Sequence, residues 1–436
     1  MSSKPKVLIW CDSPNVATGF GNVAKNLFSE LHKDFEVDIV GINDYGLKKY
    51  DHSLYHIYPV QQSAPLGDTV LRHVLQNNIY DIIFMFQDIF HISQILPAIK
   101  QAFQNYKYIN YFPIDGGPLY IEWKNLFELA DKNITYTQFA LDMIADSFPS
   151  VDISKVDYLY HGVEPIFKRL SRQERKRVKA EFKWTDKFVA VNINRYQPRK
   201  NISATIRSWA LFSKGYKLCE CGNAYPKHLK YCDANRCGPD KVVKETEGHD
   251  DVTLYLHMRP YEKVNGPGPS NTIQALLRQA GFTDQDIRSG MVMVQERDIY
   301  AQPYTVEQMN EIYNAADINI STTVGEGVGL SLIEAAGSGT ISIAPRNSAV
   351  LEMLEGHGVL VDCVPNGLFT QPLDNSFKRP NVDTLKFAEA LEDQYQKWTA
   401  NGRKKIISQE SIDAVATKFD WQDKRDYIRD QLLALL

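Results

Sequence analysis

Short apolar runs alternate with amphipathic stretches from one end of this chain to the other, and this alternation constrains its fold most. Residues 7–10 and 188–193 are apolar at almost every position, which is typical of strands whose sheet is covered on both faces. Residues 22–31 and 92–103 lie between such runs and have the apolar period of helices. The pattern predicts parallel sheets made of βαβ units. Because it occurs in two successive blocks, it predicts an α/β protein with two doubly wound domains.

Twelve strands are expected, six in each block. In the first block they are residues 7–10, 37–42, 82–86, 108–112, 134–137 and 156–160. In the second they are residues 188–193, 252–257, 291–294, 318–321, 341–344 and 359–363. Thr305 followed by Gln308 fits a capping box, which predicts that a helix begins there and ends near Asp317.

A length of 436 residues exceeds what one hydrophobic core usually serves, which agrees with two domains. We expect an N-terminal domain of residues 1–165, a basic linker of residues 166–186 and a C-terminal domain of residues 187–418. The stretch 168–187 is rich in lysine and arginine. It is interpreted either as a solvated helix or as a patch that faces a polyanion or a membrane.

Charge and hydropathy exclude several classes of protein. The 49 basic and 53 acidic residues give a net charge of −4, so no global positive field attracts nucleic acid or anionic lipid. No segment approaches the ~20 apolar residues that span a bilayer. The N-terminal residues lead directly into the first expected strand. Its apolar run is too short for the hydrophobic region of a signal peptide. We therefore expect a cytoplasmic protein without a transmembrane segment.

The strongest chemical signal is a glycine-rich segment, residues 325–334, directly after the expected strand 318–321. Its alternating glycines allow a ligand to approach the backbone, and a helix that begins near Gly329 presents free N–H groups suited to phosphate. Glu326 and Glu334 can accept hydrogen bonds from the paired hydroxyls of a ribose and a sugar. The alternative is an ordinary turn with a solvated Glu326 and a salt-bridged Glu334.

Glu326 and Glu334 match the E-x7-E motif of retaining glycosyltransferases of family 4 (glycosyl transferases group 1), and the chain resembles this family along most of its length except roughly residues 216–250. The segments 334–340 and 312–317 are similar to the same family. So are Gly19-Phe20-Gly21, His161-Gly162-Val163, Asn194-Arg195 and Lys200-Asn201. The resemblance implies the GT-B fold, in which two Rossmann-like domains face each other across a cleft. It also implies that the N-terminal domain takes the acceptor and that a final helix, residues 419–436, crosses back to it.

The resemblance gives roles to the residues that match its motifs. Arg195 and Lys200 would hold the diphosphate of a nucleotide sugar, although both are also compatible with ordinary surface charge beside Arg199. Glu334 would bind the ribose hydroxyls, and Glu326 would contact the transferred sugar. The remaining residues implied in donor binding are Gly19, Gly21, Gly327, Gly329 and Leu330.

The acid/base residue is less clearly marked, because many family members have a histidine where this chain has Asp115. The carboxylate of Asp115 could stabilise positive charge or accept the proton of the acceptor. His91 and Asp88, which follow an earlier strand, are competing candidates. A structural or turn-capping role is the alternative for each of the three.

Four of the six cysteines crowd into one short stretch, as Cys219, Cys221, Cys232 and Cys237. Two close thiol pairs, C-x-C and C-x4-C, resemble a short zinc ribbon, and four thiolates close a tetrahedral site with no open position. We therefore expect structural zinc in an insertion of residues 216–248 and no catalytic metal. Free thiols or disulfides are the alternative, and His228 is a substitute ligand.

The sequence predicts a retaining glycosyltransferase, either hexosyl or pentosyl, that moves a sugar from a nucleotide-diphosphate donor to a hydroxyl acceptor. A glycan, a lipid-linked saccharide or a small molecule would serve as acceptor. Lysines and tyrosines interleave around the cysteines. They leave open a DNA-modifying glycosyltransferase acting on hydroxymethylated bases of viral DNA, or a non-catalytic GT-B scaffold whose zinc module binds nucleic acid. A GT-B epimerase or phosphorylase is a further enzymatic alternative. The oligomeric state is left open.

Overall fold

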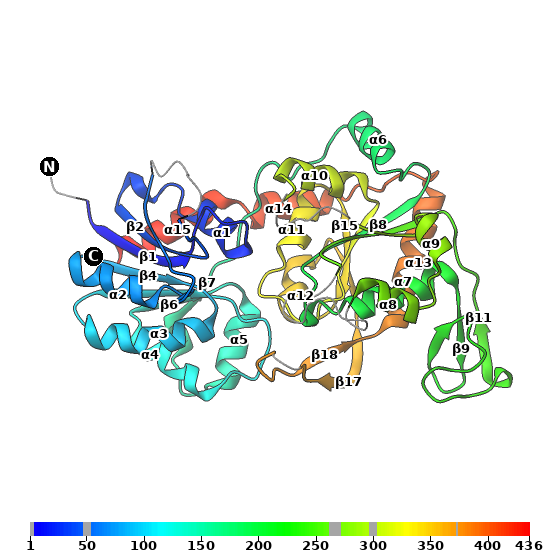
Figure 1. Cartoon of the computed structure of the whole chain (residues 1–436), viewed down its shortest axis with the longest axis horizontal. Coiled ribbons are helices and arrows are strands. Elements are labelled where there is room, and N and C mark those ends of the chain that lie inside the picture. Colours follow the sequence, from blue (N-terminus) through cyan, green and yellow to red (C-terminus); the bar gives the residue numbers. More distant parts are fainter. Residues whose placement is uncertain (1–3, 47–53, 261–271, 296–302, 372–373) are drawn as a thin grey trace. The chain divides into compact units, whose positions relative to one another are not determined.

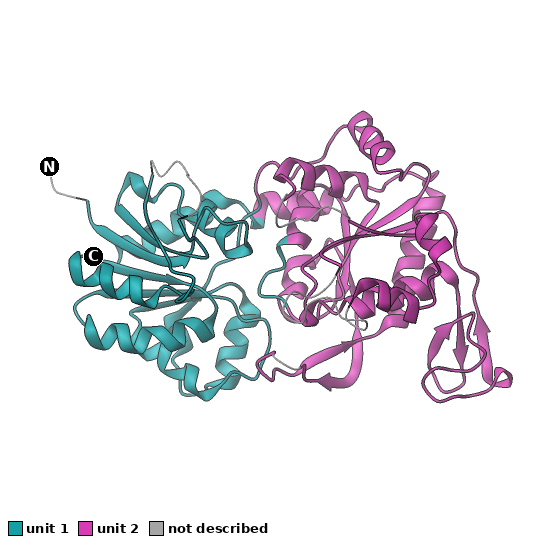
Figure 2. Ribbon diagram, in the orientation of Figure 1, with its two compact units in different colours: residues 1–163, 326–330, 418–436 teal, residues 164–325, 331–417 magenta. Residues whose placement is uncertain are grey.

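A computed structural model describes residues 4–46, 54–260, 272–295, 303–371 and 374–436. The chain forms two compact units (Figure 2). Unit 1 contains residues 1–163, 326–330 and 418–436, and unit 2 contains residues 164–325 and 331–417. Each unit is built around its own parallel sheet.

Unit 1 contains a seven-stranded parallel sheet in the order β3-β2-β1-β4-β5-β6-β7, with helices on its two faces (Figure 1). Its central strands are buried along nearly their whole length, as their unbroken apolar sequence predicts. The strands are β1 (Lys6–Asp12), β2 (Glu36–Ile42), β3 (His56–Pro59), β4 (Ile82–Phe86), β5 (Lys107–Phe112), β6 (Lys132–Thr135) and β7 (Val156–Tyr158). The helices are α1 (Gly19–Leu27), α2 (Asp68–Asn77), α3 (Ile89–Ala102), α4 (Leu126–Leu129), α5 (Gln138–Ser147) and α15 (Trp421–Leu433).

Unit 2 contains a six-stranded parallel sheet in the order β13-β12-β8-β14-β15-β16. Its strands are β8 (Phe188–Ile193), β12 (Val252–His257), β13 (Val292–Val294), β14 (Ile318–Ile320), β15 (Ile341–Pro345) and β16 (Val359–Val361). The helices are α6 (Arg172–Glu181), α7 (Ile202–Lys214), α8 (Ile273–Gln279), α9 (Asp284–Arg288), α10 (Val306–Ala315), α11 (Leu330–Gly337), α12 (Ser348–Leu354), α13 (Thr384–Ala400) and α14 (Gln409–Lys418).

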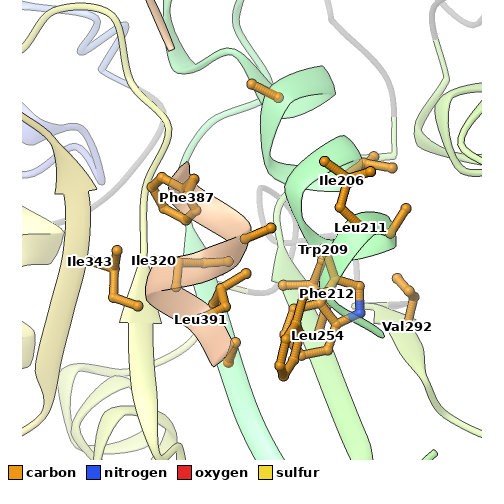
Figure 3. Close-up of a cluster of buried hydrophobic side chains, with 14 of the residues drawn as sticks. Ile206, Trp209, Leu211, Phe212, Leu254, Val292, Ile320, Ile343, Phe387 and Leu391 are labelled. Atoms are coloured by element: carbon orange, nitrogen blue, oxygen red, sulfur yellow. The ribbon is translucent and has the colours of Figure 1, made fainter. Parts of the chain in front are cut away.

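The main core of unit 2 lies between one face of this sheet and the helices α7 and α13. Figure 3 shows Trp209 and Phe212 of α7 and Phe387 and Leu391 of α13 among side chains of the sheet. Ten of the thirteen residues of α7 are buried, so this helix is covered on nearly all sides. A second cluster joins Leu332 of α11 to α12 through Ala344 of β15.

All twelve expected strands correspond to strands of the two parallel sheets, and the two doubly wound sheets are confirmed. The capping box at Thr305 is also present, because its hydroxyl accepts from the Gln308 N–H while the Gln308 side chain accepts from the Thr305 N–H. The expected strand 359–363 is divided, since β16 ends at Val361 and a separate strand begins at Cys363.

The sequence did not predict six further strands. The edge strand β3 is only partly buried, so it lacks an apolar run. A three-stranded antiparallel sheet, β10-β9-β11, is formed by β9 (Tyr216–Cys219), β10 (Ala224–Pro226) and β11 (Val242–Glu245). A two-stranded sheet joins β17 (Cys363–Phe369) to β18 (Arg379–Val382). These strands are antiparallel and do not follow the βαβ pattern, and β11 and β17 are largely exposed.

The chain leaves unit 1 near residue 163 and returns to it near residue 418, and these two segments are hydrogen-bonded to each other. The N–H of Val163 donates to the carbonyl oxygen of Phe419 at 2.8 Å. Residues 164–187, which include α6, are grouped with unit 2. Helix α15 lies beside α1 in unit 1. Within the described ranges, no helix combines the length and the apolar character that crossing a bilayer requires.

Candidate functional site

The sheet of unit 2 reverses its strand order between β8 and β14. From β8 the chain moves outward through β12 to β13, whereas β14 continues in the other direction through β15 to β16. Strands β8 and β14 are adjacent and parallel, so the loops at their carboxyl ends emerge side by side. In open α/β sheets this switch point is where ligands bind. The two loops are residues 194–201, called here the basic loop, and residues 321–329, called here the glycine-rich loop.

Direct hydrogen bonds join the basic loop to the glycine-rich loop. The N–H of Val324 donates to the carbonyl oxygen of Arg199 at 3.0 Å, and Arg199 Nη1 donates to the carbonyl oxygen of Gly325 at 2.6 Å. The hydroxyl of Thr322, which is fully buried, donates to the carbonyl oxygen of Asn201 at 2.8 Å. Both loops are thus joined by one backbone hydrogen bond and by side chains that bind backbone oxygens.

Among the predicted donor-binding residues, Arg195 and Lys200 lie in the basic loop of unit 2, after the carboxyl end of β8. Arg195 is exposed and Lys200 is half-buried, both in the basic loop. Gly329 has φ of +88°, a conformation that glycine adopts without strain, and Leu330 is the first residue of α11. Residues 326–330, with Glu326 and Gly327, are grouped with unit 1. Glu326 is 6% exposed.

Glu334 lies on α11 and is hydrogen-bonded to α10. The hydroxyl of Tyr313 donates to Glu334 Oε2 at 2.9 Å. Burial raises the pKa of Glu334 to about 7, with a smaller raising effect from Glu164, while the Tyr313 hydrogen bond acts in the opposite direction. A carboxylate whose pKa lies near neutrality and that already accepts one hydroxyl is suited to accept further hydroxyls when it is ionised.

The sheet of unit 1 has its own switch point, between β1 and β4, and a buried carboxylate lies there. Asp12, the last residue of β1, is 3% exposed. Its Oδ1 accepts from Gln87 Nε2 at 2.8 Å, and its Oδ2 accepts from the hydroxyl of Thr18 at 2.5 Å. Thr18 in turn caps α1, because its Oγ1 accepts from the Gly21 N–H at 2.9 Å.

The two glycines predicted in unit 1 have different surroundings. A Cβ added to Gly21 would lie 2.4 Å from the carbonyl oxygen of Val16 and 2.8 Å from that of Ser13, so this glycine is required by the backbone packing of its own loop. A Cβ added to Gly19 would meet nothing within 4 Å. Of these two glycines, Gly19 is therefore the one with open space beside its backbone.

His91 and Asp115 belong to unit 1, where they follow neighbouring strands β4 and β5. Burial lowers the pKa of His91, while a hydrogen bond with Gln94 and the charge of Asp12 act in the opposite direction, so the ring is neutral near pH 7. Its Nδ1 has no hydrogen-bond partner among the described residues. Asp115 is half-buried in the loop after β5. The competing candidate Asp88 is the N-cap residue of α3.

Two residues of these switch points were not predicted from the sequence. Arg199 was regarded as surface charge, and nothing in the spacing shows that it reaches Gly325. Asp12 carries a signal that was overlooked, since a carboxylate that directly follows a buried apolar strand lies at the edge where α/β sheets bind ligands.

The four clustered cysteines lie in the antiparallel sheet β10-β9-β11 and its turns, which form a separate lobe of unit 2 (Figure 1). Their sulfur atoms all lie within 4.8 Å of one another, and Cys221 Sγ lies 3.7 Å from Cys232 Sγ. A disulfide requires about 2.05 Å, and all six cysteines of the chain are free. His228 instead packs against Gly281, where an added Cβ would lie 2.0 Å from its ring. The four thiols therefore have the arrangement of a metal site.

Much of the positive charge that the sequence shows around these elements is paired. Lys227 lies 3.5 Å from Glu245 and also pairs with Glu247, and Lys241 pairs with Glu220 at 3.2 Å. On α6, Arg177 pairs with Glu181 and Glu311, and Lys179 pairs with the buried Asp317 at 2.8 Å. The basic stretch 168–187 thus includes a helix whose charges are partly neutralised.

No model of a known protein family and no curated protein matches this sequence significantly. Solved structures do match along the whole chain. HepE of Anabaena in complex with UDP-glucose is 14% identical, with a TM-score of 0.60 over 98% of this chain and 99% of that chain. Sucrose-phosphate synthase of Thermosynechococcus elongatus is also 14% identical, with a TM-score of 0.65 over 99% and 100%. WaaG, a glycosyltransferase involved in lipopolysaccharide biosynthesis, is 11% identical, with a TM-score of 0.61 over 98% of each chain.

These similarities concern the fold, because the sequence identities are low. Both parallel sheets and the helices that cover them are shared with glycosyltransferase structures over nearly the full length of each chain. The chain therefore has the GT-B fold, with a small cysteine-containing lobe in its second α/β unit.

Proposed function

We propose that this protein is a retaining glycosyltransferase, similar to family 4, that transfers a sugar from a nucleotide-diphosphate donor to a hydroxyl acceptor. The observation that carries the proposal is the pair of hydrogen bonds between Arg199 and the segment Val324-Gly325. They fix the basic loop beside the glycine-rich loop at the switch point of unit 2. HepE, which has the same fold, is a structure with bound UDP-glucose.

In this proposal the basic loop, the glycine-rich loop and Glu334 bind the donor. When the bond between the sugar and the diphosphate breaks, negative charge grows on the leaving phosphate oxygen. Arg195 and Lys200, together with the N–H groups of the glycine-rich loop, would stabilise that charge more strongly in the transition state than in the bound substrate. Glu334 would hold the ribose hydroxyls, and Glu326 would contact the sugar.

Unit 1 would then supply the groups that handle the acceptor. His91 is neutral near pH 7 and has a ring nitrogen without a protein partner among the described residues, so it can accept a proton. Asp115 follows the neighbouring strand and remains the second candidate. We add Asp12 as a positioning residue, because its two hydrogen bonds fix Gln87 and Thr18 around the first turn of α1.

Turnover of a panel of nucleotide sugars (UDP-glucose, UDP-N-acetylglucosamine and GDP-mannose) tests the proposal. We expect hydrolysis or transfer with at least one donor, and a loss of about 100-fold or more in Arg195→Ala and Glu326→Ala. Arg278→Ala is the matched control, because Arg278 is an exposed arginine of α8 whose nearest described ion pair, to Asp284, is long. Unchanged turnover in both site variants would reject the assignment. The anomeric configuration of the product, read by proton NMR, tests retention separately.

The nucleic-acid alternatives receive less support from the structure. The lysines on which they rest include Lys227 and Lys241, whose charges are paired with glutamates of the same lobe. A gel-shift with plain and hydroxymethylated DNA distinguishes these alternatives from a glycosyltransferase that acts on another acceptor.

A further inference from the structure

The lobe that contains the four clustered cysteines has almost no hydrophobic core of its own. Its buried cluster consists of Cys219, Tyr225 and Cys232, with Leu229, Cys237 and Val242 packed against it. Three of these six residues are the cysteines themselves. A segment this small rarely folds on hydrophobic burial alone, and natural domains of this size rely on a metal or on disulfides. The cysteines form no disulfide.

The spacing of the sulfur atoms is compatible with a tetrahedral zinc site. With Zn–S bonds of about 2.3 Å, two ligands of a tetrahedral ion lie about 3.8 Å apart. Cys221 Sγ and Cys232 Sγ lie 3.7 Å apart, and all four sulfurs lie within 4.8 Å of one another. Four thiolates fill the coordination shell, so the site is a structural one.

Both cysteine pairs lie on tight turns, as ligands of such an ion do. The Gly222 N–H donates to the carbonyl oxygen of Cys219 at 2.8 Å, and Gly222 has φ of +83°. In the second turn the Arg236 N–H donates to the carbonyl oxygen of Cys232 at 2.9 Å, and Arg236 has φ of +55°. Each turn contains two of the four thiols, whose sulfur atoms all lie within 4.8 Å of one another.

The ligand turns are connected to α7 by a chain of hydrogen bonds. Asn223 Nδ2 lies 3.3 Å from Cys232 Sγ and also donates to Asp233 Oδ1 at 2.7 Å. Asp233 accepts from Arg207 of α7, whose Nη1 lies 2.8 Å from Asp233 Oδ2. The second nitrogen of Arg207 donates to the carbonyl oxygen of Ala224 at 2.8 Å. Arg207 therefore binds the lobe at two points.

Helix α7 connects this lobe to the rest of unit 2. Trp209 and Phe212 of this helix are packed in the main core (Figure 3), while the half-buried Arg207 reaches the lobe. The basic loop directly precedes α7, and β9 of the lobe follows it. The lobe and the helix are therefore connected both through Arg207 and through the chain itself.

We propose that Cys219, Cys221, Cys232 and Cys237 bind one structural Zn²⁺ ion, and that the ion, through Asp233 and Arg207, stabilises the middle of α7. This inference concerns the stability of unit 2 and does not depend on the proposed enzymatic activity. Without zinc the four cysteines at the centre of the lobe are no longer held together, and Asp233 is no longer held in place. The backbone amides of α7 near Arg207 then become less protected from hydrogen exchange.

Zinc content tests the first half of the proposal. Full-length protein, purified under reducing conditions without chelator, should contain about one zinc ion per chain by elemental analysis. Cys221→Ser and Cys232→Ser should lose the zinc, whereas Cys363→Ser, which changes a half-buried cysteine outside the cluster, should retain it. Wild-type protein that neither contains zinc nor binds added ZnCl2 would overturn the proposal.

Amide hydrogen exchange tests the second half and needs no variant that might fail to fold. Removal of zinc from the wild-type protein by a chelator should increase exchange about tenfold in residues 205–211, because the charge-assisted contacts of Arg207 are lost. In Arg207→Ala, zinc should stay bound and chelation should no longer change exchange in residues 205–211. Exchange in α7 that is the same with and without zinc in the wild-type protein would refute the coupling.

Discussion

The guanidinium of Arg199 donates from Nη1 to the carbonyl oxygen of Gly325 at 2.6 Å, and this contact ties the two loops of the unit 2 switch point together. The N–H of Val324 donates back to the carbonyl oxygen of Arg199 at 3.0 Å. Arg199 thus binds the glycine-rich loop through its own side chain and through its own backbone carbonyl. Arg195, in the same basic loop, is exposed to solvent. In our proposal one arginine positions the loop and the other contacts the phosphates.

Replacement of Arg199 should weaken donor binding without direct loss of a phosphate contact. We expect Arg199→Ala to raise the Kd for UDP-glucose about tenfold, because a hydrogen bond from a charged group contributes about 1.5–3 kcal/mol. Isothermal titration calorimetry measures the change, with Arg278→Ala as the control. A Kd equal to that of the wild-type protein would show that the loop does not depend on this contact.

The raised pKa of Glu334 predicts a pH-dependent affinity for the donor. The carboxylate accepts ribose hydroxyls best when it is ionised, and with a pKa of about 7 its ionised fraction grows about tenfold between pH 6 and pH 8. The Kd for UDP-glucose, whose diphosphate does not titrate in this range, should therefore fall by up to about tenfold over that interval. Glu334→Gln should remove the dependence.

The hydrogen bond from Tyr313 lowers the pKa of Glu334, so its loss should raise that pKa further. We expect Tyr313→Phe to move the midpoint of the binding profile to higher pH. An unmoved midpoint would contradict the assignment of the titration to Glu334.

Because the pKa is raised in the folded protein, protonation of Glu334 also stabilises the fold. That stability is complete below its usual pKa of 4.5 and is lost as the pH rises through about 7.

Substitutions of Gly19 and Gly21 distinguish a glycine that backbone packing requires from a glycine that leaves space for a ligand. In Gly21→Ala the new methyl group would meet two backbone oxygens, at 2.4 and 2.8 Å, so we expect a loss of about 1–3 kcal/mol in stability. In Gly19→Ala the methyl group meets nothing within 4 Å, and the melting temperature should stay unchanged. If a substrate approaches the backbone there, Gly19→Ala should still lose activity. Unchanged activity would mean that no ligand uses this space.

The C-terminal helix should be necessary for the stability of unit 1. A Cβ on Gly162 would lie 2.5 Å from the ring of Trp421, and the hydroxyl of Tyr427 donates to Asp157 at 2.6 Å. We expect Trp421→Ala to cost about 3 kcal/mol, because it removes a ring that is only 5% exposed. Leu433→Ala, on the exposed side of α15, is the control. Deletion of residues 419–436 should lower the melting temperature more than either substitution, and an unchanged melting temperature would show that α15 does not support unit 1.

The sequence was sufficient to predict both parallel sheets except for the edge strand β3, because most of their strands are continuous apolar runs separated by helical patterns. The helix that starts after Thr305 was also predictable, because a capping box is a local hydrogen-bonding pattern. The strands β9, β10 and β11 were not predictable from periodicity. Their lobe depends on cysteines rather than on an apolar run, and only the cysteine spacing indicated that it existed.

Residues that act through distant contacts could not be predicted from local pattern. Arg199 and Gly325 are far apart in sequence, and only the pairing of β8 with β14 brings their loops together. The same holds for Asp12 and Gln87, which meet because β1 pairs with β4. His228 seemed a possible ligand by proximity along the chain, yet the folded lobe places it against Gly281.

By itself the sequence determined the class of fold, the glycine-rich loop and the cysteine cluster, since apolar periodicity, glycine spacing and thiol spacing are all properties of the chain read locally. Tertiary structure decided which side chains hold the two loops together, the raised pKa of Glu334 and the connection from the cysteine lobe to α7. The physical reason is that burial and hydrogen bonding between distant segments arise only when the sheets assemble, and no local pattern encodes which of the many polar side chains will meet.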